Sequence, residues 1–206
     1  QDFTKAISLK SDYTAAYNAR GLIFHDEGEL DKAIEDFTKV ISLDPKSPFI
    51  YNSRGLAYDN KGERDKAIAD YTLAISLNPD IAILYSNRGL IYSKKGEHDK
   101  AIKDMTQAIK MAPDYAIPYG VRGQSYLQIN QLDKAIEDLN QAIRLDPNNP
   151  LYYLLRSGPY NLRGLQDKAL KDISKSILLN PNNKLAYNIR STSFIERKEY
   201  DKAIKD

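Results

Sequence analysis

A block of 34 residues repeats along the whole chain without insertion or deletion. The pattern Tyr-x-x-Arg-Gly at Tyr17–Gly21 returns at Tyr51–Gly55 and again at Tyr85–Gly89. Asp-Lys-Ala recurs at the same interval, beginning at Asp31, Asp65, Asp99, Asp133, Asp167 and Asp201. A fixed period of this length indicates a solenoid of stacked repeats. Function is therefore expected on a repeated surface, and not in a unique catalytic pocket.

Each repeat has the apolar spacing of two helices separated by a turn. Tyr17, Gly21 and Phe24 share one helical face, and Gly28 ends that run. A second helical face follows, made of Ala33, Ile34, Phe37, Val40 and Ile41. Prolines end this second run in successive copies, at Pro45, Pro79, Pro113, Pro147 and Pro181. Asp31 suits the N-terminus of the second helix, where its carboxylate could accept from backbone N–H groups.

Small and charged residues recur in register. A glycine inside a helix costs about 1 kcal/mol relative to alanine, so its recurrence predicts a close helix crossing. The glycines concerned are Gly21, Gly55, Gly89 and Gly123. Lys32 and Asp36 lie one helical turn apart, which predicts an exposed ion pair, as do the equivalent residues in later copies. Arg20 and its equivalents are instead expected to reach carboxylates on an adjacent helix.

The pattern from Tyr51 to Pro79 resembles the tetratricopeptide repeat (TPR). The resemblance implies an all-α fold, a right-handed α-solenoid or superhelix of antiparallel helix-turn-helix units. It covers the chain as one array, with partial repeats at 1–13 and 184–206. The complete repeats are 14–47, 48–81, 82–115, 116–149 and 150–183.

In this family the first helices line a concave groove that commonly holds peptide segments. Carrying the groove positions over to this chain gives a candidate peptide-binding set: Asn18, Leu22, Phe49, Asn52, Leu56, Ile83, Asn87, Leu90, Val121, Gln124, Leu127, Leu151, Leu154 and Leu155. The family's clamp for chaperone C-terminal tails uses lysines and arginines at these positions, and the cations are missing here.

The inner wall changes character along the chain. Early repeats offer the amides Asn18, Asn52 and Asn87, which can bond to a peptide backbone or simply be solvated. Later repeats offer an apolar strip, which is either a contact surface or core packing between helices. The strip comprises Val121, Leu127, Leu151, Leu154, Leu155 and Leu162.

The fifth complete repeat departs from the pattern, because Gly158-Pro159 falls inside its expected first helix. A proline there removes an N–H and clashes with the carbonyl of Leu155, which predicts a kink. The kink is either a tolerated bend or a device that widens the groove beside the apolar strip.

The resemblance implies a protein or peptide as the partner, and the composition argues against other classes. The net charge is only +2, with 30 basic and 28 acidic residues interleaved, so nucleic acid is not expected. No apolar run reaches the length needed to insert into a membrane. The chain has no cysteine, which fits either a cytoplasmic or an extracytoplasmic location.

The residues indicate no catalysis and no cofactor or metal. His25 and His98 are the only histidines, and neither has a nucleophile or ligand partner nearby in sequence. Apart from Gly120 and Gly158, every glycine falls in the repeat register, so no phosphate-binding loop is expected. The leading hypothesis is therefore a non-catalytic scaffold that binds a peptide or partner helix.

The rival hypothesis is structural. Both ends of the sequence are cut repeats, so apolar surfaces around Phe3, Ile7 and Ile204 are expected to be open for end-to-end stacking. That predicts a homo-oligomer or a longer array.

Overall fold

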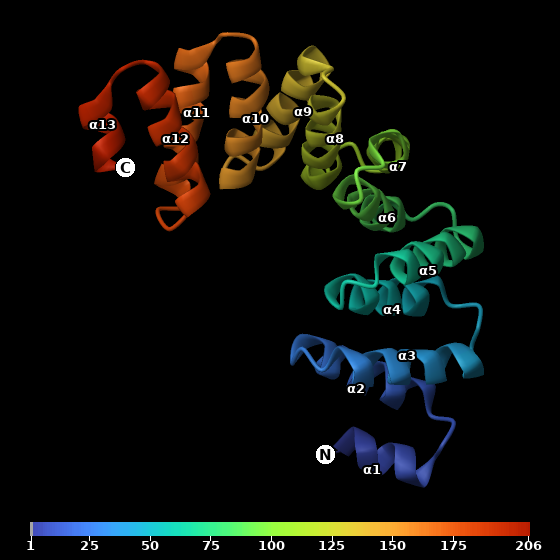
Figure 1. Cartoon of the computed structure of the whole chain (residues 1–206). Helices are drawn as coiled ribbons and strands as arrows, with labels where there is room; N and C mark the ends of the chain where they lie inside the picture. Colours follow the sequence, from blue (N-terminus) through green and yellow to red (C-terminus); the bar gives the residue numbers. More distant parts are fainter. Residues whose placement is uncertain (1) are drawn as a thin grey trace. The chain divides into compact units, whose positions relative to one another are not determined.

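The computed structural model describes residues 2–206, so the predicted place of Gln1 in a partial repeat lies outside the described residues. In this range every regular element is an α-helix, as predicted, and the chain divides into two compact units at Lys95 and Gly96 (Figure 1). Unit 1 contains α1 (Asp2–Leu9), α2 (Thr14–Asp26), α3 (Leu30–Leu43), α4 (Pro48–Asn60), α5 (Arg64–Leu77) and α6 (Ala82–Lys94). Unit 2 contains α7 (His98–Met111), α8 (Ala116–Gln128), α9 (Leu132–Leu145), α10 (Pro150–Leu162), α11 (Gln166–Leu179), α12 (Lys184–Glu196) and α13 (Tyr200–Lys205).

Glycine and proline end the helices where the sequence predicts. Gly28, two residues after α2, has a φ of +80°, a conformation that glycine adopts without steric cost. Asn130 and Lys198 occupy the same turn position with φ near 60°, a conformation that is sterically unfavourable for residues with a side chain. Pro45 follows the end of α3 at Leu43 by two residues. These turns keep the two helices of each repeat in a short hairpin.

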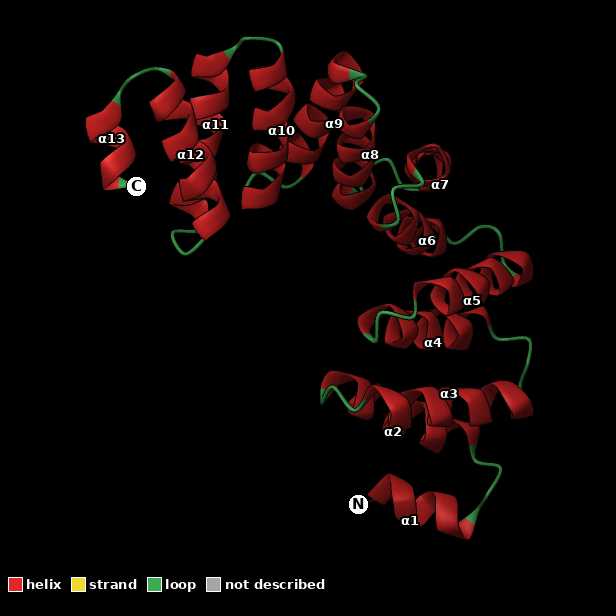
Figure 2. Ribbon diagram, viewed as in Figure 1, coloured by secondary structure: helices red, strands yellow, loops and turns green. Residues whose placement is uncertain are grey.

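Each unit is a stack of helical hairpins. In unit 1, α2 packs against α3 and α4 against α5, and α3 also contacts α4 (Figure 2). In unit 2, α8 pairs with α9 and α10 with α11 in the same way, and α9 contacts α10. First helices of successive hairpins also touch, as α2 touches α4 and α8 touches α10. Apart from α6, each first helix therefore contacts the helix before it and the helix after it in sequence, which leaves one of its faces uncovered by either.

Close helix crossings occur at the recurring glycines, which confirms the prediction made for Gly21 and Gly123. A Cβ added at Gly21 would lie 2.8 Å from the Cε1 atom of Phe37, whose side chain is fully buried. A Cβ added at Gly123 would lie 2.8 Å from Leu139 Cγ and 3.2 Å from the carbonyl oxygen of Ala135. The missing side chain lets a large residue of the second helix fill the core between the two helices.

One core position carries a polar group without a partner. Ser176 in α11 is 0 % exposed, and its hydroxyl makes no hydrogen bond, whereas Ala142 and Ala108 stand at this position in earlier repeats. A buried hydroxyl without a partner loses its bonds to water and gains nothing in return.

We expect Ser176→Ala to raise the free energy of unfolding by about 1 kcal/mol. Urea unfolding followed by circular dichroism measures it. The matched control is Ser193→Ala, because the Ser193 hydroxyl is nearly as buried but donates to the carbonyl of Ile189 at 2.9 Å, so its loss should bring no gain. A Ser176→Ala protein that is less stable than the wild type would contradict the prediction.

Candidate functional site

Polar side chains of neighbouring first helices meet in unit 1. Asn87 Nδ2 donates to Asn52 Oδ1 at 2.9 Å, from α6 to α4. Asn60 Nδ2 lies 2.9 Å from His25 Nε2, which joins α4 to α2 in the same way. We call the side of α2, α4, α6, α8, α10 and α12 that carries these positions the first-helix face, and describe it separately in each unit.

In unit 1 the first-helix face combines exposed apolar groups with amides. Leu90 and the amides of Asn18, Asn52 and Asn87 are partly buried. The exposed apolar residues are Leu22 (45 %), Phe49 (61 %), Leu56 (36 %) and Ile83 (38 %). The hydrogen bond between Asn52 and Asn87 uses one donor and one acceptor, so Asn52 keeps its two N–H groups and Asn87 keeps its oxygen.

Asn18 lies at a small cavity beside the first-helix face. The cavity has a volume of about 170 Å³, and Thr14, Asn18, Asp44 and Ser47 contribute its polar lining. It joins α2 to the loop that leads into α4. The amide of Asn18 therefore has polar neighbours but no hydrogen bond to another side chain among the described residues.

In unit 2 two of the predicted groove residues are core residues, which corrects their assignment. Val121 and Leu154 are each only 8 % exposed. Leu154 packs with Ile173, Ile177 and Ala186, so its large side chain fills the space between helices and offers no surface to a ligand. The packing alternative therefore holds for these two positions.

The remaining residues of the apolar strip are exposed to solvent at least in part. Leu151 and Leu162 are 52 % and 66 % exposed, whereas Gln124, Leu127 and Leu155 are partly buried. Helix α10 runs without interruption through Pro159, whose ring is fully buried. Leu127 approaches α10 at Gly158, where an added Cβ would lie 3.0 Å from its Cδ2 atom. A groove widened by the proline stays a prediction.

The recurring arginines form buried ion pairs, which confirms the hypothesis that they reach an adjacent helix. Arg54 donates through Nε and Nη2 to the two carboxylate oxygens of Asp70, at 2.8 Å each. Its Nη1 donates to Thr38 of the preceding repeat at 3.0 Å, and the rings of Tyr51 and Tyr58 flank the guanidinium. The hydrogen bonds to Asp70 raise the pKa of Arg54, while burial opposes that rise. These residues therefore tie repeats together.

The prediction that Lys32 pairs with Asp36 is wrong. Asp36 is 3 % exposed and accepts both hydrogen bonds of Arg20, whereas Lys32 pairs with Glu29 three residues earlier. A buried carboxylate needs a partner that can share its burial, and the planar guanidinium, held between aromatic rings, meets that need better than a flexible ammonium group. The same arrangement recurs at Asp70, Asp138 and Asp172.

The aspartates of the Asp-Lys-Ala motif lie in the first turn of the second helices, as predicted, but they do not cap them. Asp31 makes no hydrogen bond to the helix backbone and pairs with Lys61 of the next repeat at 2.6 Å. Asp167 pairs with Arg197 in the same way, also at 2.6 Å. These pairs are exposed and join neighbouring hairpins.

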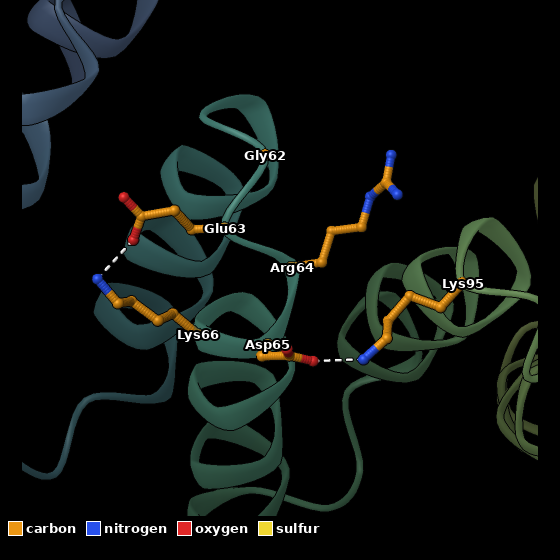
Figure 3. Close-up of a pocket in the computed structure, with 6 residues that line it drawn as sticks. All are labelled: Gly62, Glu63, Arg64, Asp65, Lys66 and Lys95. Carbon is orange, nitrogen blue, oxygen red and sulfur yellow. Dashed lines mark hydrogen bonds and ion pairs between the residues drawn. The ribbon is translucent and has the colours of Figure 1, made fainter.

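A cavity of about 520 Å³ on unit 1 lies at the turn between α4 and α5 (Figure 3). Figure 3 shows Glu63 and Lys66 facing one another and Asp65 facing Lys95, while Arg64 extends away from both pairs. The charges of this cavity are thus largely neutralised within the protein.

A smaller cavity of about 220 Å³ lies on the first-helix face of unit 2, between α10 and α12. Asn161 comes from α10, and Asn188, Thr192 and Glu196 come from α12. The sequence prediction stopped at the last complete repeat and missed the α12 residues. Carrying the same repeat positions into 184–206 would have found them.

The two histidines lie apart from any metal-binding group. Among residues 2–206 no cluster of three or more His, Cys, Asp or Glu side chains could hold a metal ion. His25 contacts Asn60 on the first-helix face, and the Nδ1 atom of His98 is buried without a hydrogen bond. Within the same range no helix has both the length and the apolar character to cross a bilayer.

Models of one repeat family match successive parts of the chain. A model described as TPR repeat matches residues 21–62, and models described as Tetratricopeptide repeat match residues 48–81, 80–148 and 121–176. A search of curated proteins finds no match.

Several solved structures share the fold. YrrB, described as a TPR protein with an unusual peptide-binding site, is 20 % identical with a TM-score of 0.73, covering 92 % of this chain and 98 % of that chain. The MamA protein is 27 % identical with a TM-score of 0.72, covering 82 % of this chain and 92 % of that chain. PilF of Pseudomonas aeruginosa is 18 % identical with a TM-score of 0.82, covering 93 % of this chain and 87 % of that chain.

Proposed function

Because the chain belongs to the tetratricopeptide repeat family, we propose that it is a non-catalytic protein-interaction scaffold whose first-helix face binds an extended peptide or a partner helix. The repeats and their structural neighbours support the scaffold role. Binding of a peptide or partner helix on the first-helix face is the more specific part of the proposal. The repeat boundaries set out from the sequence are part of the same proposal.

The observation that carries the proposal is the exposure of large apolar side chains beside amides on one face of unit 1. Three large apolar side chains of this face are each more than a third exposed: Leu22, Phe49 and Ile83. Other apolar residues fill the core. Apolar groups gathered on one face of a folded protein usually mark a contact surface. The neighbouring amides of Asn52 and Asn87 retain donors and an acceptor that can bond to a peptide backbone.

The fold also supports a peptide ligand by analogy. The structure of YrrB is described as having an unusual peptide-binding site, and its chain shares this fold at 20 % identity. That likeness concerns the fold alone and does not identify the ligand of this chain. The exposed residues of the first-helix face support a peptide ligand more strongly than this likeness in fold does.

The experiment is selection from a random-peptide library, followed by titration of the selected peptides. We expect Phe49→Ala to weaken binding about tenfold, equivalent to about 1.4 kcal/mol, because it removes an exposed aromatic contact without touching the core. The matched control is Leu73→Ala, since Leu73 is 48 % exposed but lies on the second helix α5. Equal binding by Phe49→Ala, Asn52→Ala and the wild type would rule out this surface in unit 1.

Self-association is the alternative that the sequence left open. Phe3 and Ile204 are 39 % and 83 % exposed, whereas Ile7 is partly buried. Light scattering of the purified chain distinguishes the two roles. A monomer at high protein concentration would argue against stacking through these residues.

A further inference from the structure

The cavity between α10 and α12 has the chemistry of a site for a positively charged side chain. We infer that it receives a lysine or arginine of the segment bound on the first-helix face of unit 2, with Glu196 as its ion-pair partner and Asn161 and Asn188 as further acceptors. The inference rests on the proposed function and adds the kind of peptide that unit 2 selects.

Apart from the amide N–H groups of Asn161 and Asn188, the polar groups of the cavity are acceptors. The Thr192 hydroxyl donates to the carbonyl of Asn188 at 2.8 Å, and the Ser193 hydroxyl donates to the carbonyl of Ile189 at 2.9 Å. Since both protons are used within α12, the hydroxyl oxygens can only accept from a ligand. The Glu196 carboxylate likewise only accepts. A ligand rich in donors and without acceptors, such as an ammonium or guanidinium group, complements this lining.

The charge of Glu196 also favours a cationic ligand. On the first-helix face of unit 2 the candidate positions of α8, α10 and α12 are apolar, small, amide or hydroxyl residues, and Glu196 is the one ionisable side chain among them. It is exposed and has no ion pair among the described residues. A single carboxylate among the uncharged positions of this face favours a cationic partner over an anionic one.

In unit 1 an ion pair joins the two side chains that stand at the repeat positions of Glu196 and Asn161. There Lys94 Nζ donates to Asp59 at 2.7 Å, from the first helix of one repeat to that of the preceding repeat. Glu196 and Asn161 occupy the positions of Lys94 and Asp59 in their own repeats, yet no hydrogen bond joins them in the described structure and a cavity lies between them. At these two positions in unit 2 the protein supplies a carboxylate and no cation.

The neighbouring pair adds an apolar requirement. Leu162 and Leu127 stand at the same two positions one repeat earlier, and Leu162 is 66 % exposed. Neighbouring helices pack about 8–10 Å apart, a distance that an extended peptide at about 3.3 Å per residue covers in about three residues. The inferred ligand is therefore an extended segment with an apolar residue and a lysine or arginine about three residues apart.

The test compares the wild type, Glu196→Gln and the matched control Glu137→Gln in random-peptide selection. Glu137 is an exposed carboxylate of α9, on a second helix of the same unit. We expect the wild type and Glu137→Gln to enrich peptides with the apolar and basic pair, and Glu196→Gln to lose the basic preference. A selected peptide should bind Glu196→Gln about tenfold more weakly than the wild type, and replacing its basic residue by norleucine should remove that difference.

The outcomes separate this inference from the proposed function. Selected peptides that bind with no basic preference, or that bind Glu196→Gln as tightly as the wild type, would overturn the inference and leave the scaffold proposal standing. A wild-type chain that selects no peptide would overturn both. Thermal unfolding of each variant shows that the exposed substitutions leave the fold intact.

Discussion

Replacing Asp138 by alanine is expected to lower the free energy of unfolding by about 3–5 kcal/mol. Asp138 is 5 % exposed and accepts from Nε and Nη2 of Arg122, at 2.7 and 2.8 Å. Its removal leaves a partly buried guanidinium without its counter-charge, and this loss exceeds the worth of the pair itself. Arg122 also donates to Thr106 at 3.0 Å, so losing its anchor should loosen the contact with the preceding repeat.

Urea unfolding measures this effect, with Asp133→Ala as the matched control. Asp133 lies on the same helix and pairs with Arg163, but its side chain is 76 % exposed, so its loss should cost less than about 1 kcal/mol. Repeat arrays can unfold in steps, and the unfolding midpoints at two spectroscopic probes should therefore be compared. Equal stability of Asp138→Ala and Asp133→Ala would show that the arginine pairs do not hold the repeats together.

Leu139→Ala is expected to cost about 2–5 kcal/mol. The Leu139 side chain is fully buried, and its Cγ atom occupies the space that a side chain at Gly123 would need. Its truncation leaves a cavity that the rigid helix crossing cannot close. Gly123→Ala should cost about 1–3 kcal/mol for the opposite reason, since it adds volume where none is free.

The double variant Gly123→Ala/Leu139→Ala tests the pairing. Because the new methyl group partly fills the space left by the leucine, the combined loss should be smaller than the sum of the single losses. The control is Leu178→Ala, whose 72 % exposed side chain should change stability by less than about 0.5 kcal/mol. Additive losses would mean that the two positions do not share one packing site.

The sequence predicted the helices and their crossings because each depends on local rules that recur. Pro45 and Gly28 end helices through their own backbone constraints, and Gly21 allows the approach of Phe37 because it has no side chain. The partner of Asp36 could not be predicted in this way. Two cations were within reach in the repeat, and the choice of Arg20 depended on how deeply the carboxylate is buried.

The candidate site was harder to predict for a related reason. Position in the repeat indicates which side of a helix a residue occupies, but not whether a large side chain there turns into the core. Leu154 does so and Leu151, three residues earlier, does not. The cavity beside Glu196 is open because no hydrogen bond joins Glu196 to Asn161. Residue spacing alone does not reveal this.

The most direct test of peptide binding on the first-helix face is hydrogen exchange of the backbone amides, with and without a selected peptide. We expect added protection in first helices, in α2, α4 and α6 of unit 1 or in α10 and α12 of unit 2, with α3, α5, α9 and α11 unchanged on their outer surfaces. Protection confined to the second helices would contradict the proposal.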